Sequence, residues 1–197
     1  MHPNRAFAWD DRDALLAFVA EVSFAHLFAG TSEGPMVAHV PVLVSPAGTL
    51  RFHLSRGNRM TTHLDGAIAL ASVAGPDSYV SPDWYAQTTD QVPTWNYVTA
   101  EIEGPVRTLS AEELVDLLDD VSAGHEARIA GKRPWTRAKM SPGRFEAMCQ
   151  AIVGFELMPT AVRGTRKLGQ NKRAEDRVAV AAALGTHPVG TLMGGER

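Results

Sequence analysis

The sequence contains a single cysteine, Cys149, among its 197 residues. One thiol cannot form an intramolecular disulfide, and it cannot supply the sulfur ligands of a cysteine-rich zinc site or an iron–sulfur cluster. Long apolar runs are also lacking: none approaches the ~20 residues that a helix needs to span a bilayer. The first residues, Met1 to Arg5, contain no apolar signal-peptide core. These features predict a soluble protein of the reducing cytoplasm, neither exported nor embedded in a membrane.

An excess of positive charge is lacking as well, because the formal net charge is -3. A protein that binds nucleic acid usually carries a basic surface, so DNA is a partner that the composition does not support. With 45% hydrophobic residues, the chain can bury one sizeable core. We predict one domain over residues 1–185 and a flexible, glycine-rich C-terminal tail over residues 186–197.

Local patterns predict a mixture of helices and short strands. Helical spacing of apolar residues, with Asp10 and Ser110 as N-caps, predicts helices over 10–21, 110–122 and 171–184. Ser141 and Pro142 indicate a further helix start before Phe145 and Met148. Runs rich in Val, Leu and Phe between turn residues predict strands over 23–30, 36–44, 49–54, 66–74, 97–108 and 151–158. Six strands at hairpin spacing indicate an α+β protein built on an antiparallel barrel, not a βαβ sheet.

A polar turn follows the third predicted strand. Ser55, Arg56 and Asn58 supply a hydroxyl, a guanidinium and an N-cap, and Gly57 supplies a flexible backbone. Free backbone N–H groups at the start of a short helical turn, together with an arginine, suit a phosphate group. The simpler interpretation is an ordinary surface turn capped by asparagine, and the turn by itself favours that interpretation.

A second candidate site is the loop predicted over residues 75–97. It holds all three tyrosines and two of the four tryptophans, more than an ordinary exposed loop carries. Planar side chains beside hydroxyls and an amide can stack on a ring system and hydrogen-bond its edges. The same aromatic side chains could cover an open barrel end, and the two interpretations are compatible.

Four histidines lie in or near the predicted strands: His26, His39, His53 and His63. A lone strand histidine is more often structural than a ligand, and no helical histidine pair or carboxylate spacing forms a metal motif, so we predict no metal. The basic segment from Arg163 to Arg173 could meet a phosphate, a partner subunit or DNA, although a solvated turn is the simpler interpretation. No nucleophile motif supports a hydrolase.

Five segments in this order resemble the PaiB family of FMN-binding split-barrel proteins, described as negative transcriptional regulators: 38–41, 53–58, 75–85, 92–97 and 167–171. The most specific part is Tyr-x-Ser-Pro-x-Trp-Tyr followed by Val-Pro-Thr-Trp-Asn-Tyr. The resemblance implies a six-stranded antiparallel split β-barrel with flanking helices. It also implies a homodimer with FMN at or near the subunit interface.

The resemblance further implies which residues contact FMN. In related split-barrel flavoproteins the phosphate lies at the turn after the third strand, and the flavin ring runs along the preceding strand. Carried over by position, the implied contacts are Ala38, His39, Val40, His53, Ser55, Arg56, Asn58, Tyr79, Ser81, Trp84, Thr94, Trp95, Asn96, Lys167 and Gln170. No residue stands out as an essential acid or base.

Three functions follow from the resemblance. The first is a flavin-linked negative transcriptional regulator, although the sequence has no helix-turn-helix with a basic recognition helix. The alternative is an FMN-dependent oxidoreductase that passes hydride or electrons between NAD(P)H and a small substrate, so enzymatic activity stays open. Haem binding through His39, His53 or His63 is a third possibility, which the tryptophan- and serine-containing loop fits less well than a flavin.

Overall fold

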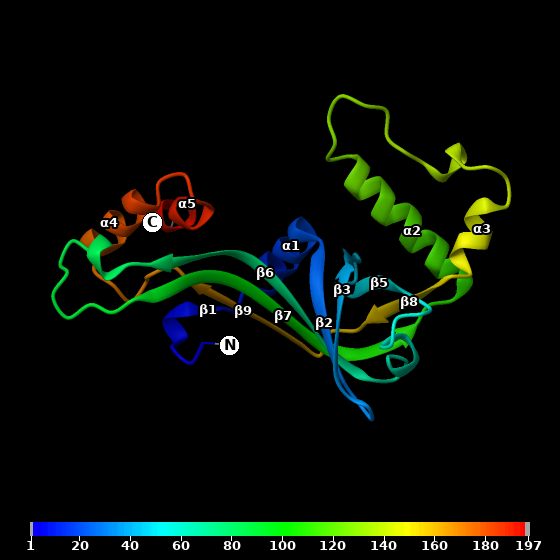
Figure 1. Cartoon of the computed structure of the whole chain (residues 1–197), viewed down its shortest axis with the longest axis horizontal. Helices are drawn as coiled ribbons and strands as arrows, with labels where there is room; N and C mark the ends of the chain where they lie inside the picture. Colours follow the sequence, from blue (N-terminus) through cyan, green and yellow to red (C-terminus); the bar gives the residue numbers. More distant parts are fainter. Residues whose placement is uncertain (1, 196–197) are drawn as a thin grey trace. The chain divides into compact units, whose positions relative to one another are not determined.

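The computed structural model describes residues 2–195 (Figure 1). Contacts group the chain into two compact units. The first, here called the central unit, comprises Leu16–Val73 and Glu101–Val162. The second, here called the terminal unit, comprises Met1–Leu15, Ala74–Ala100 and Arg163–Arg197. The predicted boundary of a single domain at residue 185 stays a prediction.

The strands follow one another in the order β3-β2-β6-β7-β8-β5-β4. Their bounds are β2 Phe24–Thr31, β3 Gly34–Pro41, β4 Leu43–Val44, β5 Leu50–Ser55, β6 Ile68–Val80, β7 Thr94–Thr108 and β8 Ile152–Leu157. Within the central unit, β2 pairs with β3 and β6, β5 with β4 and β8, and β7 with β8, all antiparallel. Residues of β6 and β7 belong to both units, because the division cuts these strands after Val73 and Ala100.

Alternating side chains build the core of the central unit. Met36, Ala38 and Val40 are buried on β3, while Val37 and His39 between them are exposed, which is the period of two that a half-buried strand requires. On β5 and β8, the buried rings of Phe52 and Phe155 stack with their centroids 5.7 Å apart.

The helices of the central unit cover one part of this sheet. They are α2 (Ala111–Glu126) and α3 (Arg144–Cys149), with the short η4 (Arg137–Lys139) between them and η2 (Thr61–His63) earlier in the chain. The predicted capping box is present, since Ser110 Oγ accepts from Glu113 N and the Glu113 carboxylate accepts from Ser110 N. Leu114 and Leu117 of α2 pack with Leu109 in one apolar cluster, so α2 lies against β4, β5 and β8 (Figure 1).

The terminal unit combines short strands with two packed helices. It contains η1 (Arg5–Phe7), β1 (Ala8–Trp9), η3 (Pro82–Trp84), α4 (Ala174–Leu184), α5 (Pro188–Gly195) and most of β9 (Ala161–Lys167). The helix α1 (Arg12–Val22) begins here and continues into the central unit. Strand β1 pairs with β9 antiparallel, and α4 packs against α5 and η3.

The predicted α+β class is confirmed, but the predicted count of six strands is wrong. The described residues form nine strands, and their hydrogen-bonded order does not close into a ring. Strands β1 and β4 have two residues each, too few to show a pattern in the sequence. Strand β9 has arginine and lysine among its seven residues, and these charges made it resemble a surface turn.

Two segments are more ordered than the sequence indicates. Strand β6 extends to Val80 and β7 begins at Thr94, so the aromatic loop is shorter than predicted. The predicted flexible tail forms α5 as far as Gly195, because Val189 and Met193, one helical turn apart, are both buried. Residues 196 and 197 of that tail lie outside the described residues.

Candidate functional site

The polar turn after β5 lies in the central unit and satisfies most of its own backbone donors. Arg56 N donates to Ala151 O (2.8 Å) and Asn58 N to Ser55 O (2.9 Å). The Asn58 side chain accepts from Met60 N at 2.9 Å. The following helix, η2, has only three residues. The predicted cradle of free backbone N–H groups at a helix start is therefore not formed, and an anion would have to be held by side chains.

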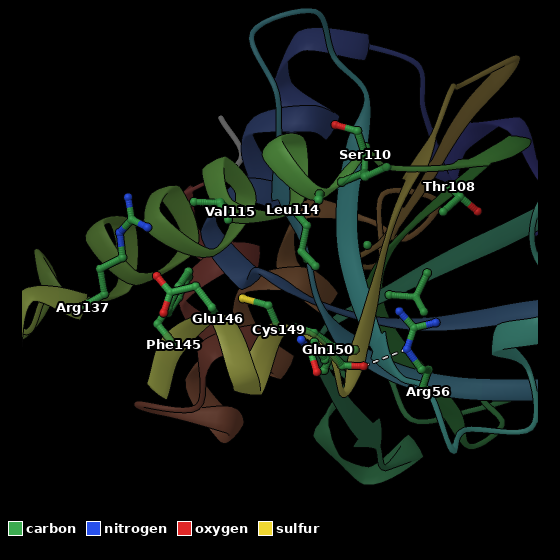
Figure 2. Close-up of a pocket in the computed structure, with 15 residues that line it drawn as sticks. Arg56, Thr108, Ser110, Leu114, Val115, Arg137, Phe145, Glu146, Cys149 and Gln150 are labelled. Carbon is green, nitrogen blue, oxygen red and sulfur yellow. Dashed lines mark hydrogen bonds between the residues drawn. The ribbon is translucent and has the colours of Figure 1, made fainter. Parts of the chain in front are cut away.

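Two arginines of this turn have uncommitted donors. Arg56 is exposed, and its Nε donates to Gln150 O at 2.8 Å, as Figure 2 shows. Within residues 2–195, the terminal nitrogens of Arg56 and the whole guanidinium of Arg59 have no hydrogen-bond partner. Ser55 Oγ accepts from Gly57 N (3.3 Å) and keeps its own proton to donate. These donors suit a phosphate, which accepts charge-assisted hydrogen bonds.

Arg59 was not among the predicted site residues. The available signal was its positive charge, three residues after Arg56 in the same short turn. Its exposure and lack of a partner could not be read from the sequence, because both depend on what packs beside the turn.

Strand β3, the predicted ring-binding strand, has its predicted contact residues on two different faces of the sheet. Ala38 and Val40 point into the core, whereas His39 is exposed and its Nδ1 lies 2.7 Å from His26 Nδ1 on β2. Strand β3 is the last strand of the hydrogen-bonded order, and none of the described strands pairs with its outer edge. A planar ligand along β3 would therefore meet backbone groups of that edge.

The His53 side chain lies in a different place from the polar turn after β5. It lies on β5 and lines a pocket together with residues of α2, α3 and the segment that joins them. Burial lowers the pKa of His53, since a charged imidazole loses its hydration there. The side chain is therefore a neutral group facing an apolar cavity.

In the terminal unit, four of the predicted residues come together. The rings of Tyr79 on β6 and Trp95 on β7 meet edge to face, with centroids 6.2 Å apart. Both are well exposed, at 43% and 54%. Lys167 Nζ donates to Thr94 Oγ1 at 2.5 Å and to Trp95 O at 2.7 Å. Burial, and secondarily the charge of Lys172, lowers the pKa of Lys167. The cluster offers aromatic surface beside a fixed cation.

The remaining predicted residues of this unit have local structural partners. Ser81 caps η3 by accepting from Asp83 N (3.3 Å), and Trp84 lies half-buried in η3. Asn96 is buried and its Nδ2 contacts Met193 Sδ at 3.4 Å. Gln170 closes its own turn, accepting from Leu168 N (2.9 Å) and donating to Arg166 O (2.7 Å). Asn96 and Gln170 therefore hold the surroundings of the aromatic cluster in place.

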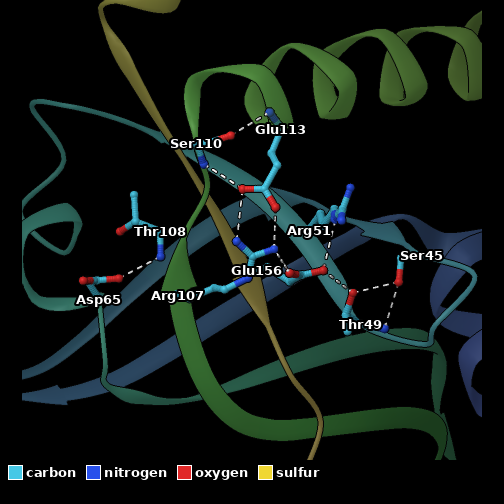
Figure 3. Close-up of polar contacts among 9 residues, drawn as sticks. All are labelled: Ser45, Thr49, Arg51, Asp65, Arg107, Thr108, Ser110, Glu113 and Glu156. Carbon is cyan, nitrogen blue, oxygen red and sulfur yellow. Dashed lines mark hydrogen bonds and ion pairs between the residues drawn. The ribbon is translucent and has the colours of Figure 1, made fainter.

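An ionic network around the buried Glu156, which the sequence did not reveal, joins the sheet of the central unit to α2 (Figure 3). Glu156 on β8 accepts from Thr49 Oγ1 (2.6 Å), from Arg51 Nε (3.0 Å) and from Arg107. Burial opposes ionisation of Glu156, but these three donors outweigh it and hold its pKa below the ordinary value.

Arg107 extends the network to α2. It donates to both carboxylate oxygens of Glu113, at 2.7 and 3.0 Å, and this pairing lowers the pKa of Glu113 to about 2. Because Glu113 also belongs to the capping box, the network joins the first turn of α2 to β7 and β8. Its carboxylates are occupied by internal donors, which is the arrangement of a structural network.

Among the described residues, no helix combines the length and apolar composition of a membrane-crossing segment. No group of three or more His, Cys, Asp or Glu side chains in that part of the chain is placed to hold a metal ion.

Sequence comparison identifies a family. The family model described as "Putative FMN-binding domain" matches residues 1–161. The Bacillus subtilis (strain 168) protein named "Protease synthase and sporulation protein PAI 2" is 26% identical over 188 residues, which cover 93% of this chain and 89% of that protein. The polar turn after β5 and the aromatic cluster up to Trp95 lie inside the family match, whereas Lys167 and Gln170 lie beyond it.

Two solved structures share the fold. The FAD and haem binding protein from Mycobacterium smegmatis is 17% identical with a TM-score of 0.59, covering 89% of this chain and 79% of that one. The flavocytochrome Anf3 from Azotobacter vinelandii is 15% identical with a TM-score of 0.60, covering 84% and 72%. At these identities the likeness establishes the architecture.

Proposed function

We propose a function from the premise that this chain belongs to that FMN-binding domain family. The protein binds the phosphate of FMN at the turn after β5 and acts as a flavin-dependent oxidoreductase. FMN is the cofactor of the family. The observation that carries the proposed site is the pair of exposed arginines, Arg56 and Arg59, whose terminal donors are uncommitted.

The donor set of the turn fits a phosphate dianion. Two guanidinium groups balance its charge, and the Ser55 hydroxyl adds a neutral donor. Hydrogen bonds between an arginine and a phosphate are charge-assisted and directional, so they fix position as well as affinity. The Nε of Arg56 is held by Gln150 O, which orients the rest of the guanidinium for this role.

Considered by itself, the aromatic cluster of the terminal unit suits a flavin ring system, and we propose it as a surface for such a ring. Bound FMN would supply hydride or electron transfer. Tyr79 and Trp95 would shield the ring from water, and Lys167 would place a cation beside it. Two of the donors on Lys167 Nζ are used by Thr94 and Trp95, and one is left for a ligand. A positive charge at that position would favour the reduced, more electron-rich flavin.

A homodimer is proposed from the outer face of the β2–β3 hairpin. Phe24, Phe28 and Val37 are 46%, 43% and 48% exposed there. Phe28 and Val37 lie directly opposite each other in the strand register, beside the His26 and His39 pair. Large apolar side chains gathered on one sheet face mark an interaction surface, and two-fold pairing of identical chains is the commonest way to cover one.

Transcriptional regulation is the second candidate, and it is favoured by the relative named as a sporulation protein. Direct DNA contact would need the basic segment from Arg163 to Arg173. The cations of this segment are engaged within the chain: Arg166 lies 5.1 Å from the Trp9 ring, Lys172 donates to Gln91, and Arg173 pairs with Asp176. We propose that any regulation acts through the flavin and not through this segment on DNA.

Anaerobic titration with NADPH separates the two candidates. Loss of the oxidised-flavin absorbance of the FMN-loaded protein would support the oxidoreductase. Replacing Lys167 with Met should slow this reduction, whereas replacing the exposed Lys139 with Met should not. Unchanged flavin absorbance, together with a salt-sensitive shift of a DNA fragment by the same protein, would contradict the proposal and favour the regulator.

A further inference from the structure

Two adjoining cavities lie between the sheet and the helices α2 and α3 of the central unit. The larger has a volume of about 470 Å³ and the smaller about 320 Å³. Both are lined by Phe145, Cys149 and Ile152, so the two cavities adjoin at these side chains. Each is within the size range of small-molecule sites, which are concave, mostly apolar and few in any one protein.

The smaller cavity contains an uncommitted polar group in an apolar setting. His53 lines it, and within the described part of the chain its ring nitrogens have no hydrogen-bond partner. Burial lowers the pKa of His53, so the imidazole is neutral at neutral pH and carries one donor and one acceptor. Around it stand Leu118, Trp135, Met140, Phe145 and Met148. A partly buried imidazole gains stability from a partner, and a ligand can provide one.

The charges that border this cavity are already compensated. Asp119 pairs with Arg137 at 3.2 Å, and the Arg137 guanidinium lies over the Phe145 ring at 5.0 Å. Burial raises the pKa of the Cys149 thiol, which keeps it protonated. A charged ligand would lose its hydration here without gaining a free counter-charge. The cavity therefore selects an uncharged ligand.

Arg56 and Arg137 lie on opposite sides of the larger cavity (Figure 2). Arg56 belongs to the proposed phosphate turn, so the smaller cavity, which Arg56 does not line, is a separate site. Trp135 and Phe145 give the smaller cavity two flat aromatic surfaces, which favour a planar ligand.

We propose that the cavity bounded by His53, Trp135, Phe145 and Cys149 binds a small, uncharged aromatic molecule that shares one hydrogen bond with His53. This site goes beyond the proposed FMN function and does not depend on it. It gives the α2–α3 region, which the FMN proposal does not use, a ligand-binding role.

Calorimetric titration of the full-length protein with 1-naphthol, a neutral two-ring phenol, tests the site. Saturable binding is expected, and His53→Leu should weaken it about tenfold because one hydrogen bond is lost while the volume is kept. The charged analogue 2-naphthalenesulfonate should bind at least about tenfold more weakly. His63→Leu, at a histidine of η2 that does not line the cavity, should bind 1-naphthol like the unmodified protein.

A second readout places the ligand and guards against misfolding. The indole N–H signal of Trp135 in a proton–nitrogen NMR spectrum, assigned through Trp135→Phe, should shift on titration. FMN titration of each variant reports separately on the phosphate turn, so failure of one site is distinguishable from failure of the other. Absence of saturable binding, equal affinity in His53→Leu, or equal affinity for the sulfonate would overturn the proposal. So would a haem absorbance band that depends on His53, because it would assign the cavity to haem.

Discussion

At the scale of the residue, the account depends most on Arg56. Its side chain is exposed and makes a single hydrogen bond, to Gln150 O, so its removal should leave the fold intact. We expect Arg56→Ala to weaken FMN binding by about 1–3 kcal/mol, the range for losing a charge-assisted hydrogen bond. Fluorescence titration with FMN measures this. Arg133→Ala, at an exposed arginine outside the turn, is the matched control, and equal loss in both variants would refute the specific role of Arg56.

His53 supplies a pH-dependent prediction. Burial holds its folded-state pKa below the ordinary 6.5. The unfolded chain therefore binds the proton more readily than the folded chain, and the stability present above pH 6.5 is lost as the pH falls through the folded-state pKa. His53→Leu should reduce the difference between urea unfolding midpoints measured at about pH 7.5 and about pH 5.5. An unchanged difference would show that other groups cause the acid loss.

The residues that sequence reasoning missed share a physical reason. Glu156 lies in an apolar strand pattern, and only the fold brings Thr49, Arg51 and Arg107 to it. Arg59 likewise becomes a candidate phosphate contact only from the structure, which shows its exposed guanidinium without a hydrogen-bond partner. Residue types with a local motif, such as the Ser110 and Glu113 capping box, were predicted correctly because both members lie within one helical turn.

At the scale of the element, close backbone approach requires a glycine within β7. Gly104 lies within β7, and a methyl group on it would lie 1.9 Å from the carbonyl oxygen of Met158, the residue directly after β8. A backbone carbonyl cannot move aside as the end of a flexible side chain can. Gly104→Ala should therefore destabilise the protein by about 3 kcal/mol or more.

Gly124 is the matched control for this substitution. It lies in α2, and nothing stands within 4 Å of an added methyl group. Gly124→Ala should leave stability unchanged or raise it by up to about 1 kcal/mol, since alanine favours helix. Thermal unfolding of both variants measures the contrast. Similar unfolding temperatures would contradict the tight contact at Gly104.

Elements with strong periodicity were predictable, and those defined by long-range pairing were not. Within the strand predicted over 97–108, Val98, Ala100 and Ile102 alternate with polar residues, and all three are buried. Strand β9 was not predicted, because its pairing with β1 depends on a close approach that the sequence does not show. An added methyl group on Gly164 would lie 2.4 Å from Leu15. Helix α5 was not predicted, because its glycines have low helix propensity. Burial of Val189 and Met193 overrides that preference in the structure.

At the scale of the whole molecule, the chain divides into two compact units, and each carries one group of the predicted site residues. The phosphate turn belongs to the central unit, and Tyr79, Trp95 and Lys167 belong to the terminal unit. Local patterns indicated the polar turn and the aromatic loop, and the resemblance to a known family added Lys167 and Gln170 to the predicted contacts. The partners of Asn96 and Gln170 emerged only from the structure.

Calorimetric titration of the cofactor-free protein with FMN, and in parallel with riboflavin, tests the central claim most directly. We predict saturable binding of one FMN per chain, and affinity for riboflavin lower by about tenfold or more because it lacks the phosphate. No heat on FMN injection, or equal affinity for riboflavin, would contradict the claim that the arginines after β5 hold the cofactor by its phosphate.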